Sequence, residues 1–319
     1  MLLNIILLVA GFVVLIKGAD VFVDGASGIA RYFNVSKMLI GLTIVAFGTS
    51  APELAVSIKS LLSGSGDIVL GNVIGSNILN ILLILGVSST IHNLSVKNST
   101  VKKEIPMLLL LTFLFSTLLL DSFFDPSISN VFTRSDGIVI LLFFLVFVYY
   151  LIHMMRNKID DDDEDTDTKD MSLIKSMAFT ILGIVAIVLG SNFVVDSASG
   201  IAGDLGVSER LIALTIVALG TSLPELVTSV VATKKGEYDI AIGNVVGSNI
   251  FNIGMVVGIP VAILGTIPNV TISYIDIITM IISVILLFIF SFNDRKISRN
   301  EGVIFLLIFL IYYSYIILV

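Results

Sequence analysis

Two glutamates end the two copies of an internal repeat. TIVAFGTSAPE covers residues 43–53 and ends on Glu53, and TIVALGTSLPE covers residues 215–225 and ends on Glu225. Nine of eleven positions are identical, including polar ones that hydrophobic composition alone would not reproduce. On a helix, Ala46, Thr49 and Glu53 share one face, with Ser50 one position round. The second copy supplies Ala218, Thr221, Ser222 and Glu225 in the same order.

A second repeated motif adds amides and hydroxyls. GNVIGSNILN at residues 71–80 matches GNVVGSNIFN at residues 243–252 in eight of ten positions. Helical spacing aligns Asn72, Ser76 and Asn80 in one copy, and Asn244, Ser248 and Asn252 in the other. Carboxylate, amide, hydroxyl and backbone oxygens suit a hard cation, so they predict a site for Ca²⁺ or Na⁺ and not for Zn²⁺ or Cu²⁺. The chain has no cysteine, which excludes a thiol or disulfide mechanism.

The composition predicts an all-α integral membrane protein. With 56% hydrophobic and 13% charged residues in 319, the chain cannot cover an ordinary soluble surface. A bilayer crossing needs roughly 20 apolar residues. Ten such runs, and hence ten transmembrane helices, can be placed at about 2–24, 37–62, 67–90, 105–121, 136–155, 173–195, 208–233, 239–264, 271–292 and 301–319.

The repeat divides the chain into two halves. Residues 1–155 form a first five-helix half, 156–172 an acidic linker, and 173–319 a second five-helix half. Because five is odd, the second half must cross the membrane in the opposite sense. Such inverted-topology repeats place their sites near the membrane midplane, where the halves meet. Pro52 and Pro224 have no N–H, so they are expected to break helices 2 and 7 and free backbone carbonyls to face an ion.

Basic residues predict the orientation. Loops after the odd-numbered spans carry 14 Lys and Arg, and the opposite loops carry 3. The linker is therefore expected in the cytoplasm and both termini outside, in a multi-pass protein of the plasma membrane. The acidic run at residues 160–165 of the linker is expected to be a solvated hinge, with a low-affinity cation collector or a regulatory Ca²⁺ site as the alternative.

Glutamates in the middle of membrane spans need a functional explanation. A charge at the bilayer centre costs at least ~2.5 kcal/mol, and no Lys or Arg lies within either motif to pair with Glu53 or Glu225. The two motif pairs resemble the α-repeats of the cation/calcium antiporter superfamily, specifically the prokaryotic sodium/calcium exchangers. The resemblance covers essentially the whole chain and is most specific at GTSAPE (residues 48–53) and GTSLPE (residues 220–225).

The resemblance implies a secondary antiporter, and not an enzyme, that exchanges Na⁺ for Ca²⁺ by alternating access. It implies that Glu53 and Glu225 bind Ca²⁺ together with backbone oxygens of Thr49 and Thr221. It implies flanking Na⁺ sites at Ala46, Ser50 and Ser76 on one side and at Ala218, Ser222 and Ser248 on the other, with Asn80 and Asn252 completing the centre. The expected partners are Ca²⁺, Na⁺ and the lipid bilayer, with no organic cofactor, no nucleic acid and a monomeric transport unit.

Some alternatives stay open. Related exchangers often carry Asp where this chain has Asn252, so the site holds two formal charges and not three, which leaves the Na⁺ stoichiometry open. Desolvation favours the neutral form of a buried glutamate, so H⁺ is a possible counter-ion. An intramembrane prenyltransferase-like enzyme could use the acidic run, but the second Asp cluster that it would need is missing. Glu104 and Glu301, outside the motifs, are expected in loop or interfacial positions.

Overall fold

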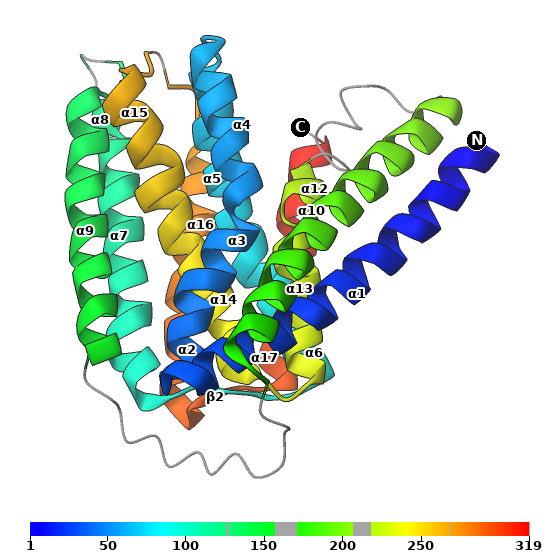
Figure 1. Cartoon of the computed structure of the whole chain (residues 1–319). Coiled ribbons are helices and arrows are strands. Elements are labelled where there is room, and N and C mark those ends of the chain that lie inside the picture. Colours follow the sequence, from blue (N-terminus) through cyan, green and yellow to red (C-terminus); the bar gives the residue numbers. More distant parts are fainter. Residues whose placement is uncertain (126, 128, 157–170, 207–217, 269, 319) are drawn as a thin grey trace.

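A computed structural model describes residues 1–125, 127, 129–156, 171–206, 218–268 and 270–318, apart from the side chain of residue 218. The described chain is almost entirely helical (Figure 1). Both termini lie at one end of the molecule, which we call the termini side (Figure 1). Helix α9 (Arg134–Arg156) ends and α10 (Leu173–Asp204) begins at the other end, the linker side (Figure 1). Most of the predicted linker lies outside the described residues, and so does the first part, residues 208–217, of the seventh span predicted at 208–233.

The remaining elements follow the chain in this order: α1 (Leu2–Phe33), α2 (Lys37–Ile40), η1 (Gly41–Val45), α3 (Ala46–Thr49), α4 (Ala51–Leu62), α5 (Gly66–Leu79), η2 (Asn80–Leu85), α6 (Gly86–Ile91), β1 (Leu94–Ser95), η3 (Thr100–Glu104), α7 (Ile105–Leu118), α8 (Asp121–Phe124), α12 (Ala218–Thr221), α13 (Leu223–Lys234), α14 (Tyr238–Phe251), η5 (Asn252–Val257), α15 (Gly258–Leu264), α16 (Tyr274–Asp294), β2 (Lys296–Ile297) and α17 (Arg299–Leu318). The η elements are π-helical.

Seven helical stretches in the described part of the chain are long and apolar enough to cross a membrane, and a bent pair raises this to eight. Of the ten predicted spans, the fourth corresponds to α7, which has only 14 residues and is preceded by the charged η3 turn. The seventh begins outside the described residues. Helices α1 and α10, at 32 residues each, run well past the predicted ends of spans 1 and 6. The fold is therefore an all-helical one with many membrane-length helices.

The second predicted span bends where the sequence predicts a break. The helical parts on either side of Ser50 are inclined by 45°. Pro52 lies in the first turn of α4, where its missing N–H would have no helical partner anyway. Between α12 and α13 the chain is interrupted at Ser222, and Pro224 lies in the first turn of α13. Ser50 (φ −86°, ψ 3°) and Ser222 (φ −89°, ψ 2°) have nearly the same backbone conformation.

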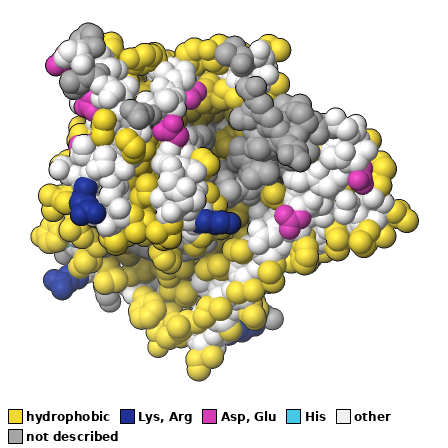
Figure 2. Space-filling model, turned by 90° about the horizontal axis from the view of Figure 1, so that it is seen from above, with side chains coloured by type: hydrophobic (Ala, Val, Ile, Leu, Met, Phe, Trp, Pro, Cys, Tyr) yellow, Lys and Arg dark blue, Asp and Glu magenta, His cyan; other side chains and the backbone are white. Residues whose placement is uncertain are grey.

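Two motif-bearing spans form the centre of the molecule. In the run from α5 to α6, 72% of the most apolar 18-residue segment is buried inside the protein, and in the run from α14 to α15 the share is 83%. The corresponding share is only 22% in α1, α9 and α17. The peripheral helices turn hydrophobic side chains outward, so that these side chains make up most of the rim when the molecule is viewed from the termini side (Figure 2). Such a rim is the surface that lipid would cover.

Helices α1 and α10 lie side by side and lean away from the other helices (Figure 1). Small residues allow this close approach: a Cβ on Gly18 would lie 2.8 Å from Cβ of Ala186, and one on Gly183 would lie 2.7 Å from the Cα of Phe22. Packing of this kind through small residues is common between membrane helices, because apolar side chains gain little from leaving lipid.

Short extended segments join the two halves. Leu94 of β1 pairs with Ile297 of β2 in an antiparallel arrangement, and Phe132 forms an isolated antiparallel bridge with Ile267. The first contact joins the segment after α6 to the segment before α17. The second joins the segment before α9 to the segment after α15. Each half therefore contributes its last long helix to a contact with the other half.

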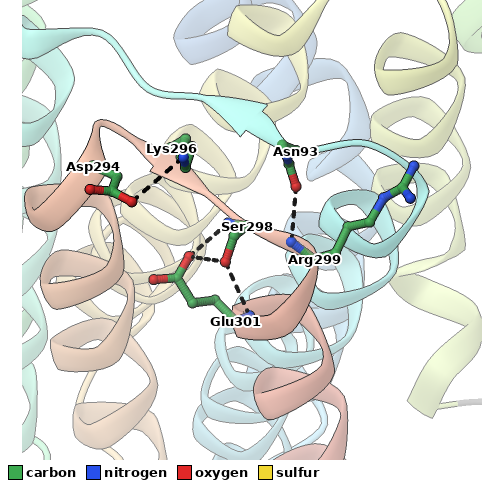
Figure 3. Close-up of polar contacts among 6 residues, drawn as sticks. All are labelled: Asn93, Asp294, Lys296, Ser298, Arg299 and Glu301. Atoms are coloured by element: carbon green, nitrogen blue, oxygen red, sulfur yellow. Dashed lines mark hydrogen bonds and ion pairs between the residues drawn. The ribbon is translucent and has the colours of Figure 1, made fainter.

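The helices that follow these bridges start with matching caps. At α17, the N–H and the hydroxyl of Ser298 both donate to Glu301 Oε2 at 2.7 Å (Figure 3). At α9, Thr133 and Asp136 make the same two bonds at 2.7 Å. These are capping boxes, which satisfy backbone N–H groups that a helix start leaves without partners.

An arginine in each cap reaches the other half. Arg299 Nη2 donates to the carbonyl of Ile91 at 3.2 Å, and Arg134 Nη2 donates to the carbonyl of Ile263 at 3.3 Å. The sequence carries this third repeat as TRSDG at residues 133–137 and SRNEG at residues 298–302. This pair is offset by 165 residues and not by the 172 that separate the two longer motifs, so it lies out of register with them.

The expectation that Glu104 is a loop or interfacial residue is wrong. Its side chain is 0% exposed, and one carboxylate oxygen accepts a hydrogen bond from the hydroxyl of Tyr150 on α9. The Lys103 ammonium lies 5.9 Å from the centre of the same tyrosine ring. Sequence spacing could not predict this position, because the partner of Glu104 comes from a helix that starts 30 residues later.

Candidate functional site

Glu53 and Glu225 lie in the first turns of α4 and α13, directly after the two helix breaks. Both are 1% exposed, and their charges are close enough to interact. Ser50 Oγ donates to Glu225 Oε1 at 3.2 Å. The other Glu225 oxygen and both Glu53 oxygens have no hydrogen-bond partner within 3.5 Å among the described residues. Buried carboxylate oxygens without donors are unfavourable unless a cation compensates them.

Hydroxyls from both halves surround the two carboxylates. The hydroxyl of Thr221 lies near the Glu53 carboxylate, and those of Thr49 and Ser50 lie near Glu225. Thr49 Oγ1 is also 3.0 Å from Asn244 Oδ1 and 3.4 Å from Ser248 Oγ. The residues of the first glutamate motif therefore meet the amide motif of the other half, as inverted halves require.

Asn80 and Asn252 are the first residues of the π-helical stretches η2 and η5. Asn80 Nδ2 donates to Asn249 Oδ1 at 2.8 Å, and Asn252 Nδ2 donates to Asn77 Oδ1 at 3.1 Å. The carbonyl oxygens of Asn80 and Asn252 are buried and have no partner in the described part of the chain. The cross-half bonds thus hold each amide by its nitrogen and leave its carbonyl oxygen available for an ion.

Asn77 and Asn249 are site residues that the sequence analysis missed. Each donates through its side-chain nitrogen to the backbone carbonyl of the other at 3.3 Å. They accept from Asn252 and Asn80, so the four amides form one closed network across the halves. They lie off the predicted stripe of ligands, but both copies contain the same GSN triplet, a repeated signal that could have identified them.

The hydroxyls of the predicted flanking sites are buried but differ in their contacts. Ser76 is 3% exposed and lines a cavity. Ser222 is 4% exposed, and its hydroxyl has no partner among the described residues. The carbonyl of Ala46 accepts the N–H of Ser50 at 3.0 Å. The side chain of Ala218 lies outside the described residues.

Two cavities reach this region. The larger of the two measures ≈ 530 Å³, and its lining includes Asn72, Ser76 and Thr221. Ile68, near the start of α5, and Ile316, near the end of α17, also line it. Both of these helix ends lie on the termini side (Figure 1). We call the larger cavity the termini-side cavity. A smaller cavity of ≈ 190 Å³ lies between Pro52, Pro224 and α10.

The linker side is closed over the same region. A Cβ on Gly243 would lie 2.9 Å from the Cα of Gly41, and one on Gly247 would lie 2.7 Å from the Cβ of Ala46. At the matching glycines of the first half, Gly71 and Gly75, a Cβ would meet no atom of the described residues within 4 Å. Among the described residues, the glycine face of α14 is therefore packed, whereas that of α5 borders the termini-side cavity.

Fold and site together define a class: a helical membrane protein with paired acids and unpaired amide oxygens buried between two halves. The sequence model of the sodium/calcium exchanger protein family matches residues 3–153 and 175–318. The chain belongs to this family.

Known proteins resemble the chain over nearly its full length. The sodium/calcium exchanger MaX1 of Methanosarcina acetivorans is 34% identical over 341 residues, covering 96% of each chain. The inner membrane protein YrbG of Escherichia coli is 35% identical over 270 residues, covering 82% of this chain and 81% of YrbG. A solved structure of the sodium-calcium exchanger NCX_Mj matches with a TM-score of 0.85 and 31% identity over 98% of both chains.

Proposed function

We propose that the protein is a secondary antiporter that exchanges Na⁺ for Ca²⁺ across the cell membrane. The observation that carries this proposal is the buried pair Glu53 and Glu225, whose carboxylate oxygens are largely unpaired. Two carboxylates neutralise one Ca²⁺ or two Na⁺, so one pocket can hold either ion in turn. Family membership supports the proposal: MaX1 is named a sodium/calcium exchanger, and NCX_Mj crystals were soaked with Na⁺ and Ca²⁺.

The proposed ligands divide into a centre and two flanks. At the centre, Glu53 and Glu225 bind Ca²⁺ with backbone oxygens of Thr49 and Thr221. The unpaired amide oxygens of Asn80 and Asn252 complete this centre. The flanking Na⁺ sites use Ala46, Ser50 and Ser76 in one half and Ala218, Ser222 and Ser248 in the other. All are hard oxygen donors, as both ions prefer.

The proposed architecture is ten spans in two inverted halves, residues 1–155 and 173–319, working by alternating access. Two observations support inversion: the crossed bridges Leu94–Ile297 and Phe132–Ile267, and the matching caps of α9 and α17. Because one chain contains both halves of the site, the monomer is the proposed transport unit.

The proposed orientation has the termini side outside the cell and the linker in the cytoplasm. It rests on the distribution of Lys and Arg, 14 against 3. The chain lacks cysteine, so single-cysteine variants can be labelled without background. Ser129→Cys should react only with an impermeant reagent added outside, and Ser172→Cys only with one admitted to the cytoplasm; both positions are exposed. Reaction of both from one side would refute the inverted arrangement.

Isotope flux tests the function directly. Proteoliposomes loaded with Na⁺ should take up labelled Ca²⁺ when they are diluted into Na⁺-free medium, and not when Na⁺ is present at equal concentration on both sides. A pH gradient in place of the Na⁺ gradient should drive little uptake. Uptake that follows the pH gradient alone would replace Na⁺ by H⁺ as the counter-ion, and no gradient-dependent flux at all would overturn antiport.

A further inference from the structure

The termini-side cavity has a carboxylate in its wall besides the proposed ligands. Asp276, in the first turn of α16, is half-buried, and its Oδ1 accepts a hydrogen bond from the hydroxyl of Tyr312 at 2.9 Å. Both residues line the cavity, as do Ser76 and Thr221 of the candidate site. No Lys or Arg occurs among the described residues that line it. Cations on their way to the site would therefore pass this acid.

The first half has the corresponding acid. Glu104 precedes Asp276 by 172 residues, the offset of the two main motifs, and it too accepts from a tyrosine on the last long helix of its half. Glu104 is fully buried, whereas Asp276 is reached from a cavity. The acid–tyrosine pair is thus accessible on the side where the molecule is open and covered on the side where it is closed.

We propose that Asp276 recruits cations into the termini-side cavity, so that it sets the apparent affinity for external ions without being a ligand of the central site. The role assigned to the captured ions rests on the proposed antiport. A cleft with low-dielectric walls focuses the field of such a charge and concentrates counter-ions. The bond from Tyr312 fixes the position of the carboxylate in the cavity wall.

Ion charge gives the proposal a quantitative signature. A potential that concentrates a monovalent ion by a given factor concentrates a divalent ion by the square of that factor. If Asp276 enriches Na⁺ about threefold, it enriches Ca²⁺ about tenfold, within the range known for charged clefts. A direct ligand or a purely structural residue has no reason to obey this relation.

The first test needs no transport. Ile316 lines the same cavity, so Ile316→Cys supplies a reporter thiol. Its reaction rates with a cationic and an anionic methanethiosulfonate are compared, with and without Asp276→Asn. Neutralising Asp276 should lower the cation-to-anion rate ratio by about tenfold, because the two rates shift in opposite directions. Asp125→Asn, which removes an exposed acid outside the cavity, serves as control and should leave the ratio unchanged. An unchanged ratio in the Asp276 variant overturns the proposal.

The second test uses transport. Asp276→Cys should raise the KM for external Ca²⁺ about tenfold and that for Na⁺ about threefold, with kcat preserved. Modification with an anionic methanethiosulfonate should restore the KM values, and a cationic reagent should raise them further. Equal effects of both reagents would mean a steric role and would overturn recruitment. If the unmodified protein exchanges no ions, antiport fails, and the reactivity ratio alone decides the role of Asp276.

Discussion

Helices α5 and α14 carry nearly the same ten-residue motif, yet they lie in opposite surroundings. The glycine face of α14 presses against the backbone around Gly41, whereas that of α5 borders a cavity. The motifs differ only at Ile74 against Val246 and at Leu79 against Phe251. Neither change accounts for a packed face on one helix and an open face on the other. If the protein works by alternating access, as proposed, each glycine face has to fit both surroundings.

The hydrogen bonds show the same contrast. In the second half, Asn244 Nδ2 donates to Ser229 Oγ at 2.9 Å, and its Oδ1 is bonded by Thr49. In the first half, the corresponding Asn72 Nδ2 and Ser57 Oγ have no partner among the described residues. In the proposed alternating access, closure of a side would bring its amide and hydroxyl groups into contact, and opening would release them.

The largest effect is expected from removing the charge of Glu53 or Glu225, the acid that each half contributes to the site. Glu53→Gln and Glu225→Gln should each lower Ca²⁺ flux more than about 100-fold, because an unpaired buried charge costs about 3–5 kcal/mol. Glu301→Gln is the matched control, since glutamine can keep the capping box of α17. Labelled Ca²⁺ uptake in proteoliposomes measures all three, and near-normal flux in either motif variant would remove that glutamate from the site.

Alanine at matched glycines tests the packing contrast itself. Gly243→Ala places a Cβ 2.9 Å from the Cα of Gly41, and such overpacking costs about 1–3 kcal/mol, so the closed linker side should open about 5- to 150-fold more often. Gly71→Ala meets no atom of the described residues within 4 Å and should leave this conformation unchanged.

Matched thiols can report that opening. Thr228→Cys, buried on the linker side, should become reactive in the Gly243→Ala background, while Val56→Cys in the termini-side cavity should lose reactivity. Equal labelling patterns for Gly243→Ala and Gly71→Ala would contradict the idea that the two glycine faces alternate.

The amides allow a test of charge. Two glutamates balance two Na⁺, and a third would add repulsion of ~4 kcal/mol at 4 Å and an effective dielectric of 20. We therefore expect two Na⁺ per Ca²⁺ and no net charge movement. Asn252→Asp should add charge movement, but it replaces a donor to Asn77 by an acceptor, which costs about 1–3 kcal/mol in stability.

Reversal potentials in proteoliposomes measure that charge movement. Asn80→Asp is the counterpart in the other half, where the lost bond is to Asn249, and it should behave alike. Three Na⁺ per Ca²⁺ in the unmodified protein would show that amide carbonyls are sufficient for a third ion.

The smallest expected effect concerns an ion pair on the closed side. Lys235 on the linker side lies 2.9 Å from Asp20 and 2.6 Å from Asp24 of α1. At the matching position of the first half, Ser63 cannot form such a pair. Because these acids are nearly half exposed, Lys235→Met should cost only about 0–1 kcal/mol and favour opening of the linker side up to about fivefold. Labelling of the thiols introduced at Thr228 and Val56 measures this opening. The control Lys234→Met, at an exposed position, should leave the labelling unchanged. Unchanged labelling in Lys235→Met as well would mean that the ion pair does not stabilise the closed side.

Much of the site followed from the sequence, because the motifs repeat polar residues that membrane helices otherwise avoid. Breaks at Ser50 and Ser222 followed from the two prolines. The π-helical turns at Asn80 and Asn252 did not, since a π-turn depends on how neighbouring helices pack and has no residue signature as clear as proline. The sequence also could not predict that the side chains of Asn77 and Asn249 each donate to a backbone carbonyl of the other half.

The limits on span prediction have a similar cause. Hydropathy locates apolar runs well, but α1 and α10 continue past theirs to 32 residues each, because they pack on one another there. Glu104 was misplaced because a charged residue beside Lys102 and Lys103 suggests a loop, whereas its tyrosine partner comes from a distant helix. The contrast between the two glycine faces could not be predicted either, because the two motif copies are nearly identical in sequence.

The exchange of final helices between the halves has a consequence for biosynthesis. Helix α9 is made before the segment that holds it, since Arg134 caps the carbonyl of Ile263 and Phe132 pairs with Ile267. A ribosome must therefore add more than a hundred residues, on the order of 10 s at typical rates of synthesis, before α9 can dock. During that interval the membrane, or an insertion factor, has to shelter its inward face. The first half therefore completes its packing only after the second half has been synthesised. If the gene were cut at the linker, we expect the two fragments to fold fully only when they are expressed together.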